Sequence, residues 1–352
     1  MVTKKSNIKT DQPLLEVRGL QTYFFTADGV VKAVDGVDLD VFPRKTLGIV
    51  GESGCGKSIT TKSILRLIDR PGEIINGTMN LFDNSHKNSK DILKLDNKAL
   101  KKVRGGRISM IFQEPMTSFS PIHTIGNQIT ESIMLHTNNT KQEAMELAED
   151  WLIRTGMNNP KQRLKQYAFE LSGGQRQRAM IAMALCTNPD ILIADEPTTA
   201  LDVTTQAQTL DLLKDLQEKN GMSIIMITHD LGVIAELADI VNVMYLGKVV
   251  ETGTINEVYK SPMHPYTKSL LSSIPSLATK HRERLPILQG TIPHPVARPS
   301  GCNFQPNPNC KNDNPECLTA DPISIEESPG HRVLYCGPCY EEHKCAWYPR
   351  GI

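Results

Sequence analysis

The sequence predicts an α/β fold, and two patterns support this prediction. The apolar run Leu47–Val50 is followed by the glycine-rich segment Gly51–Ser58 (GESGCGKS) and then by a helix-compatible run, Ser63–Ile68. Another apolar run, in DILIADE, ends in the carboxylates Asp195 and Glu196. In α/β proteins the chemistry lies outside the carboxyl ends of the sheet strands. The sequence therefore predicts a sheet with a polar site along one edge.

The composition favours a globular protein with two domains, or with one large domain and an appendage. The 352 residues carry 39 basic and 39 acidic side chains, a balance that argues against nucleic acid as a main partner. No apolar run approaches the roughly 18 to 20 residues that cross a bilayer, and the N-terminal segment lacks the apolar core of a secretory signal. We therefore expect a cytoplasmic chain whose membrane spans, if needed, come from another polypeptide.

The segment Gly51–Ser58 fits the phosphate-binding pattern G-x-x-x-x-G-K-[ST]. Its glycines let backbone N–H groups point inward, and the following helix adds positive charge at its N-terminus. Lys57 is placed to reach the β- and γ-phosphates, and Ser58 to bind Mg²⁺. A chance glycine-rich turn is the alternative, and the strand-to-helix context argues against it. The nucleotide stays open here, because kinases, GTPases, motors and transporters share this loop.

The N-terminal part is predicted to form antiparallel strands. Leu14–Phe25 and Val30–Phe42 are expected as a hairpin closed by the turn Thr26–Gly29 (TADG). Gly77–Phe82 is expected as a further strand. The polar, lysine-rich stretch Asp83–Arg104 is expected as a solvated connection with one short helix.

A helical insertion is predicted after the buried strand Arg107–Phe112, which ends at Gln113. The insertion is expected to span about residues 114–170. Within it, the apolar residues from Thr124 to about Phe169 recur with a helical period. The apolar positions that show this period are Ala144, Leu147, Ala148, Trp151 and Leu152.

Leu171–Gln175 (LSGGQ) precedes an apolar helix that runs to about Leu185. Ser172 is a good N-cap, and two glycines at a helix start offer unblocked N–H groups to an anion. Taken alone, the segment is equally well explained as a simple cap.

Two more strand ends carry candidate catalytic groups. At the end of DILIADE, Asp195 is expected to hold Mg²⁺ and Glu196 to orient or deprotonate a water molecule, the alternative being an acidic strand end in solvent. After the turn Pro197–Asp202, a helix is expected to end at Gly221. That helix is expected to pack through Thr209, Leu212, Leu213 and Leu216. His229 follows the buried strand SIIMIT, where a γ-phosphate contact is favoured over a structural role.

With the P-loop, Gln113, LSGGQ, ILIADE, TALD and ITHD in this order, residues 12–260 resemble the ATP-binding cassette (ABC) family. The resemblance implies a P-loop NTPase cassette with an N-terminal antiparallel β subdomain and an inserted helical subdomain. It also implies a head-to-tail dimer with ATP between the P-loop of one cassette and the LSGGQ of the other.

The resemblance also assigns roles to single residues. Gln113 would sense Mg²⁺ and the membrane partner and act in catalysis with Glu196 and His229, and Asp202 would couple the two sites. Phe24 would stack on adenine, with Tyr23 or Phe25 as alternatives; without the resemblance, core packing is favoured for these strand residues. The implied nucleotide contacts are Phe24, Gly51, Ser53, Gly54, Cys55, Gly56, Lys57, Ser58, Ile59, Gln113, Ser172, Gly173, Gly174, Gln175, Asp195, Asp202 and His229. The implied Mg²⁺ ligands are Ser58, Gln113 and Asp195.

The C-terminal part, 261–352, is expected to be a small irregular, Cys-rich extension. His264–Pro275 (HPYTKSLLSSIP) resembles the segment that follows the cassette in ATPase subunits of bacterial oligopeptide and dipeptide permeases. The prolines after it predict an extended connector. These prolines are Pro286, Pro293, Pro295 and Pro299.

Six of the eight cysteines fall in the last 51 residues, which in a reducing compartment suggests metal rather than disulfides. The resemblance implies a four-iron, four-sulfur cluster on Cys302, Cys310, Cys317 and Cys336. The spacing from Cys302 to Cys310 is longer than the usual pattern, and Cys339 and Cys345 are extra. Zinc, through the CxxC at Cys336 and Cys339, and free or variably oxidised thiols stay open. Cys55 and Cys186 are expected to be packing residues.

The sequence therefore predicts an ATPase subunit that powers a di- or oligopeptide importer at the cytoplasmic face of the cell (inner) membrane. The expected partners are a second, different ATPase subunit, two permease subunits and an extracytoplasmic solute-binding protein, with no nucleic acid. Oligosaccharide, opine or nickel import is the alternative within transport. Outside transport, a nucleic-acid-associated cassette and a regulatory cassette in iron–sulfur assembly stay open.

Overall fold

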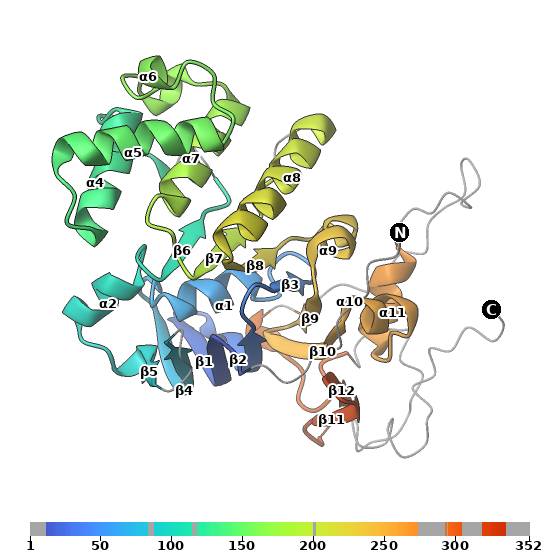
Figure 1. Cartoon of the computed structure of the whole chain (residues 1–352). Coiled ribbons are helices and arrows are strands. Elements are labelled where there is room, and N and C mark those ends of the chain that lie inside the picture. The colour runs from blue at the N-terminus through green and yellow to red at the C-terminus, as the bar shows by residue number, and fades with distance from the viewer. Residues whose placement is uncertain are drawn as a thin grey trace.

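The structure is a computed structural model that describes residues 12–83, 88–114, 118–199, 202–273, 293, 295–304 and 319–335. Within these residues the strands form two sheets (Figure 1). Helices α4 to α7 lie together at one end of the molecule, away from the hairpin of β11 and β12 (Figure 1). In the same residues, no helix combines the length and the apolar character needed to cross a membrane.

The larger sheet has the strand order β11-β12-β10-β9-β3-β8-β7-β6. Strands β3, β6, β7, β8 and β9 are parallel neighbours, and the other three strands are antiparallel. The parallel strands are almost continuously apolar because both faces of the sheet are covered. Their bounds are β3 (Thr46–Val50), β6 (Ile108–Ile111), β7 (Ile191–Asp195), β8 (Ser223–Ile227) and β9 (Ile240–Tyr245).

The carboxyl ends of parallel strands meet at one edge of a sheet, and this edge collects the predicted polar residues. The P-loop follows β3, and Gln113 comes two residues after β6. Glu196 follows β7 directly, and His229 comes two residues after β8. The predicted α/β fold with a polar edge is therefore confirmed.

The smaller sheet is antiparallel, as the sequence predicts, with the order β2-β1-β4-β5. Its strands are β1 (Leu15–Thr26), β2 (Gly29–Val41), β4 (Gly72–Phe82) and β5 (Ser89–Asp91). Thr26 pairs with Gly29, so the predicted hairpin turn is present. β4 begins at Gly72 rather than at Gly77. The connection after β4 contains the short helices η1 (Ile92–Lys94) and α2 (Asn97–Val103). It is less solvated than predicted, because Ile92 and Leu100 are buried in the core below this sheet.

The predicted helical insertion is confirmed. It consists of α4 (Ile125–His136), α5 (Lys141–Arg154), α6 (Pro160–Arg163) and η2 (Ala168–Glu170), followed by α7 (Gly173–Leu185). Of the apolar positions predicted in α5, Leu147 is partly buried and the other four are buried.

The helix after the P-loop begins earlier than predicted. Helix α1 spans Lys57–Ile64, so the predicted run Ser63–Ile68 lies mostly beyond its end. Apolar periodicity could not find its start, because the first turns of α1 bury polar side chains, Lys57, Thr60 and Thr61. Arg66, with a φ of 54°, lies in the left-handed region just past the helix.

Helix α8 (Val203–Asn220) ends at Gly221, whose φ of 67° gives the left-handed cap that the sequence predicts. Thr209, Leu213 and Leu216 are buried and Leu212 is partly buried, close to the prediction. The cassette continues with α9 (Leu231–Leu237), β10 (Lys248–Thr254) and α10 (Ile255–Lys260).

The described part of the C-terminal extension is more regular than the sequence predicts. It contains α11 (Pro265–Ser272), η3 (Pro295–Ala297), β11 (Ile323–Ser328) and β12 (His331–Tyr335). β12 pairs with β10 through Glu251↔Val333 and Thr252↔Arg332. The extension therefore continues the main sheet of the cassette.

Candidate nucleotide site

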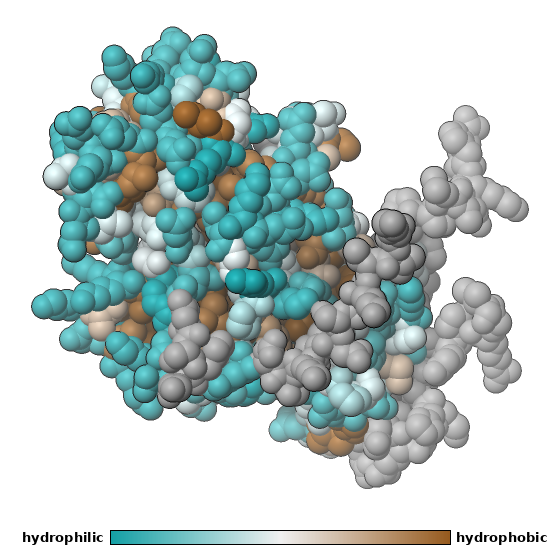
Figure 2. Space-filling model, in the orientation of Figure 1, coloured by the Kyte–Doolittle hydropathy of each residue, from teal (hydrophilic) through white to brown (hydrophobic). Residues whose placement is uncertain are grey.

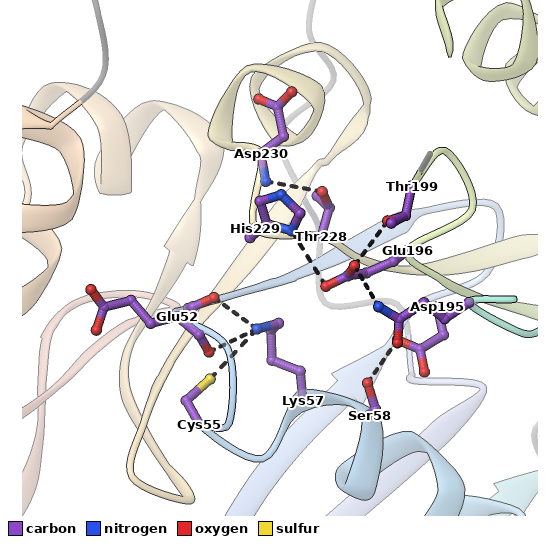
Figure 3. A network of polar contacts seen from close by, with 12 residues as sticks. Glu52, Cys55, Lys57, Ser58, Asp195, Glu196, Thr199, Thr228, His229 and Asp230 are labelled. Atoms are coloured by element: carbon purple, nitrogen blue, oxygen red, sulfur yellow. Dashed lines mark hydrogen bonds and ion pairs between the residues drawn. The ribbon is translucent and has the colours of Figure 1, made fainter. Parts of the chain in front are cut away.

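Lys57 lies inside the P-loop, where its ammonium group binds the loop's own backbone (Figure 3). Its Nζ donates to the carbonyl oxygens of Gly51 at 2.7 Å and of Glu52 at 2.9 Å, and lies 3.8 Å from Sγ of Cys55. An ammonium group has three donors, and sulfur is a weak acceptor. Two donors therefore fix the lysine, and the third can take a phosphate oxygen.

The P-loop can adopt this path only with glycine at its second conserved position. A Cβ on Gly56 would lie 2.3 Å from the carbonyl oxygen of Ala33, and the φ of Gly56 is +106°. Among the other predicted contacts of this loop, Ser53 and Gly54 are exposed, Cys55 is buried and Ile59 is half-buried.

Ser58 and Asp195 form a pair of oxygen ligands at the ends of α1 and β7. Oγ of Ser58 donates to Oδ1 of Asp195 at 2.9 Å (Figure 3). Asp195 is 2 % exposed, and burial raises its pKa although the Ser58 hydroxyl opposes this. A buried carboxylate and a hydroxyl are hard donors of the kind that Mg²⁺ prefers, and a cation would offset the burial of the charge. These two residues therefore fit a Mg²⁺ site.

Both carboxylate oxygens of Glu196 have polar neighbours from the adjacent strand ends. Oε2 accepts from Nε2 of Gln113 at 3.0 Å and from Oγ1 of Thr199 at 2.9 Å. Oε1 lies 3.4 Å from Nδ1 of His229 (Figure 3). Three predicted catalytic residues, Gln113, Glu196 and His229, thus come together in one cluster. Gln113 contacts Glu196 through its amide nitrogen.

The backbone at Glu196 is held in an uncommon conformation. Its φ is 46°, and its N–H donates to the carbonyl oxygen of Ile227 at 2.9 Å. A non-glycine residue in the left-handed region costs of order 1 kcal/mol or more, and such strain gathers at functional sites. The strain supports Glu196 as a functional side chain.

The LSGGQ segment starts helix α7 through a capping box. Ser172 accepts from the N–H of Gln175 at 3.4 Å, while Oε1 of Gln175 accepts from the N–H of Ser172 at 3.1 Å. Ser172 and Gly173 are exposed, and Gly174 and Gln175 are half-buried. The predicted N-cap is therefore present, and the exposed side of the segment is accessible to a ligand or a second protein.

The LSGGQ segment and the P-loop belong to different packing units of the chain. Helix α7 packs against α4, α5 and β6, whereas α1 packs against β1 and β2. Asp202 is also exposed, and it caps α8 by accepting from the N–H and the hydroxyl of Thr205. These hydrogen bonds lower the pKa of Asp202, and the bond from the Thr205 hydroxyl has the larger effect.

The three candidates for adenine stacking differ in their surroundings. Tyr23 donates to Oδ1 of Asp35 at 2.6 Å, and burial raises its pKa to about 12. Phe24 is half-buried beside Gly72, where an added Cβ would meet the Phe24 ring at 2.7 Å. Phe25 is 47 % exposed. The choice of Phe24 stays a prediction.

The cysteine prediction falls largely outside the described residues. Cys310, Cys317, Cys336, Cys339 and Cys345 lie there, and of the predicted cluster ligands only Cys302, which is half-buried, is described. The described residues contain no group of three or more His, Cys, Asp or Glu side chains that could hold a metal. Cys55 and Cys186 are buried, as predicted for packing residues.

The sequence reasoning missed two residues at this site. Thr199 binds Glu196 but lies in a segment predicted only as a turn. Tyr266 receives a hydrogen bond from the N–H of Glu52 in the P-loop at 3.0 Å. The HPYT segment marks the position of Tyr266 in the sequence, but its local pattern does not indicate a contact with a P-loop residue 214 positions away.

The fold and the site define a P-loop nucleotide hydrolase with a helical insertion. The sequence profile of the ABC transporter family matches residues 34–199, and that of the oligopeptide/dipeptide transporter C-terminal region matches residues 250–317. The chain is 47 % identical over 321 residues to the oligopeptide transport ATP-binding protein AppD of Bacillus subtilis, which covers 91 % of this chain and 95 % of AppD. It is 45 % identical over 330 residues to a putative peptide import ATP-binding protein of Brucella ovis, and the match covers 92 % of this chain and 97 % of that protein. The chain therefore belongs to the ABC transporter family of ATP-binding proteins.

The fold is similar to that of solved ATP-binding cassettes, including MJ0796 and cbiO1. The ATP-binding cassette MJ0796, solved as a dimer in a post-hydrolysis state with ADP and Pi, has a TM-score of 0.60 and 25 % identity. The match covers 68 % of this chain and 98 % of that one. The cassette cbiO1 of Clostridium perfringens has a TM-score of 0.59 and 27 % identity, with 71 % and 92 % covered. The cassette fold is thus shared, while the rest of this chain lies outside these matches.

Proposed function

We propose that this chain is the ATP-hydrolysing subunit that energises a membrane importer of di- or oligopeptides. One observation carries the proposal: an ATP-binding cassette and an oligopeptide/dipeptide transporter C-terminal region lie in the same chain. The relatives named above are described as oligopeptide transport or peptide import proteins, which supports the peptide class.

The strand-end residues supply the chemistry of hydrolysis. Lys57 binds the β- and γ-phosphates from the position that the P-loop carbonyls give it. Mg²⁺, when bound at Ser58 and Asp195, supplies positive charge to the phosphates. Glu196 accepts a proton from the attacking water, and Gln113, Thr199 and His229 orient its carboxylate.

The exposed LSGGQ segment supports a dimer of cassettes, in which Ser172 and Gly174 of one subunit contact the γ-phosphate held by the other. ATP favours the closed dimer because only that state makes both sets of contacts, and a ligand shifts an equilibrium only through such a difference. Hydrolysis removes the γ-phosphate and reopens the dimer. The second cassette is proposed to be a different ATPase subunit.

The helical insertion and Gln113 are the proposed contact with two permease subunits. Most of the exposed large hydrophobic side chains in the described part of the chain lie between Phe112 and Phe169, including Ile122, Leu135 and Tyr167. Figure 2 shows hydrophobic patches over these helices, and further ones lower on the same mostly hydrophilic face. We place the chain peripherally at the cytoplasmic face of the cell membrane, with a solute-binding protein outside and no nucleic acid.

We also propose that Cys302, Cys310, Cys317 and Cys336 hold a four-iron, four-sulfur cluster. The clustering of cysteines in the sequence supports it, and Cys302 lines a cavity with Tyr245, His264 and Tyr335. Metal analysis after anaerobic purification from the native host tests the proposal. We expect about four iron atoms per chain, lost in Cys317→Ser and kept in Cys186→Ser. Zinc, or no metal, would contradict it.

Peptide uptake tests the function. In a host strain without the chromosomal gene, we expect uptake of a labelled tetrapeptide to be restored by this chain and not by Glu196→Gln. Uptake of an oligosaccharide, an opine or nickel, with no peptide uptake, would move the function to those substrates. Isolation of ribosomes or iron–sulfur assembly proteins with the chain, in place of a permease, would contradict transport.

A further inference from the structure

Tyr266 joins the C-terminal extension to the P-loop. The residue lies in α11 and is fully buried, and its hydroxyl oxygen accepts a hydrogen bond from the N–H of Glu52 at 3.0 Å. Glu52 is the second residue of the P-loop. Packing alone would not require the phenol oxygen of Tyr266 to accept a hydrogen bond from a P-loop amide.

The bond acts on a particular peptide group. The N–H of Glu52 and the carbonyl of Gly51 belong to one planar peptide bond and point in opposite directions. That carbonyl accepts from Nζ of Lys57 at 2.7 Å. Tyr266 and Lys57 therefore bind opposite sides of the same peptide group. By holding the Glu52 N–H, the tyrosine fixes the orientation of the Gly51 carbonyl, which in turn positions Lys57.

The tyrosine is itself held rigidly. His264 caps α11 by accepting from the N–H of Tyr266 at 3.1 Å, and Pro265 occupies the first helical position. The Tyr266 ring lies 4.6 Å from that of Tyr245 and 6.2 Å from that of Phe304, measured between centroids. Each part of the HPY sequence thus has a role in aiming the hydroxyl at the P-loop.

The start of α11 is also tied to the sheet. The carboxylate of Glu251, in β10, accepts from the N–H of Met263 at 2.8 Å and of His264 at 3.0 Å. Its Oε1 also lies 2.9 Å from Nε2 of His331 in β12. The position of Tyr266 therefore depends on three separate parts of the extension: the HPY segment, the ring of Phe304 and the final hairpin.

We propose that Tyr266 is a positioning residue for Lys57, and that through it the C-terminal extension sets the affinity of the P-loop for ATP. Loss of the hydroxyl leaves the Glu52 N–H without its partner, which frees the Gly51–Glu52 peptide to rotate and loosens Lys57. The inference uses the proposed ATP site but does not depend on the transported substrate or on a metal.

The test compares Tyr266→Phe with Tyr245→Phe in the full-length chain. Both variants remove one hydroxyl from the same aromatic cluster, and the Tyr245 hydroxyl makes no hydrogen bond to the P-loop among the described residues. We expect Tyr266→Phe to raise the Kd for Mg·ATP about three- to tenfold, and Tyr245→Phe to change it less than about twofold.

Hydrogen exchange of the nucleotide-free protein separates positioning from general stability. We expect faster amide exchange in Tyr266→Phe in the peptide that covers Gly51–Lys57, with unchanged exchange in strands β7 and β8. Phe304→Leu, which keeps the hydroxyl but alters its support, should give a smaller change in the same direction.

The outcomes distinguish this inference from the function. A wild-type chain that fails to bind ATP contradicts the proposed function. A wild-type chain that binds ATP, with Tyr266→Phe equal to Tyr245→Phe in affinity and in P-loop exchange, overturns the inference alone. Equal acceleration of exchange throughout the fold in Tyr266→Phe also overturns it, because it would show a purely structural role.

Discussion

The two segments that we propose to contact phosphate, the P-loop and LSGGQ, are built in opposite ways. In the P-loop, Lys57 is buried and is held by two carbonyl groups, and Ser58 is hydrogen-bonded to a buried carboxylate. In the LSGGQ segment, Ser172 is exposed and its bonds close only a local capping box. The first segment is organised within the chain, while the second is organised only as a helix end. The difference supports our proposal that nucleotide binds first to the P-loop and that the LSGGQ segment contacts a nucleotide held by another subunit.

Glu196→Gln should give the largest loss of ATP hydrolysis. It should separate the hydrolysis step from ATP binding by the P-loop and from dimer formation through the LSGGQ segment. The amide keeps the size and backbone conformation of Glu196 but cannot accept a proton from water. We expect hydrolysis to fall by about 10² to 10⁴-fold, while the Kd for ATP stays within about twofold and closed dimers accumulate. Single-turnover hydrolysis and size-exclusion chromatography with ATP measure this. Thr199→Val, which removes one hydrogen bond to Glu196, should cost much less. Turnover retained in Glu196→Gln would remove Glu196 from the mechanism.

Lys57→Ala should affect the P-loop alone. Because a charge-assisted contact to the phosphates is lost, we expect the Kd for ATP to rise at least about tenfold in the single chain. Lys62→Ala, in the last turn of the same helix, is the matched control and should bind ATP nearly as the wild type does. Isothermal titration measures both. Equal affinities in the two variants would contradict the difference between the two segments.

Ser172→Ala should affect the LSGGQ segment alone. Loss of the cap destabilises the start of α7 by about 1 kcal/mol, and the contact to the second nucleotide is lost as well. We expect unchanged ATP binding to the single chain, and ATP-dependent dimer formation weakened about fivefold. Analytical ultracentrifugation of the Glu196→Gln background, with and without Ser172→Ala, measures this. A lower affinity of the monomer for ATP would show that the LSGGQ segment serves its own P-loop.

The smallest effect concerns pH and the Glu251–His331 pair, which anchors the start of α11. The hydrogen bond from Glu251 raises the pKa of His331 above its ordinary 6.5, aided by nearby Glu257 and Glu327. Burial raises the pKa of Glu251, but hydrogen bonds from His331 and the backbone outweigh burial and hold it below its ordinary 4.5.

The sign of the pH effect follows from these two shifts. The stabilisation from His331 is complete below pH 6.5 and is lost as the pH rises through the folded-state pKa of His331. That from Glu251 is complete above pH 4.5 and is lost as the pH falls through its folded-state pKa. The attachment is therefore strongest between these values. We expect the melting temperature to fall about 2 °C more between pH 6 and 8.5 in the wild type than in His331→Gln. Parallel curves would show that the pair does not titrate on unfolding.

The elements that could be predicted from sequence are those with local signals. The buried parallel strands are continuously apolar, Ser172 and Gly221 are residue types that helix caps favour, and each predicted catalytic residue lies within two residues of the end of its strand. Strand ends then collect at one edge by topology, so the cluster of Gln113, Glu196 and His229 followed without further information.

The elements that could not be predicted depend on contacts between distant residues. Tyr266 and Glu52 are 214 residues apart, and Glu251 and His331 are 80 apart. The hairpin β11–β12 has few buried positions, so its pattern alone does not mark it as part of a sheet. The start of α1 could not be found from apolar periodicity, because the first turns of this helix bury polar side chains.

The union of the final hairpin with β10 limits how this protein can be shortened or recombined. Cutting the chain before residue 319 would remove β12, the strand that pairs with β10. The backbone N–H and C=O groups on that edge of β10 would then be unpaired and could pair with a strand of another copy. A chimaera that exchanges the C-terminal region between relatives would therefore also have to exchange β10, including Glu251.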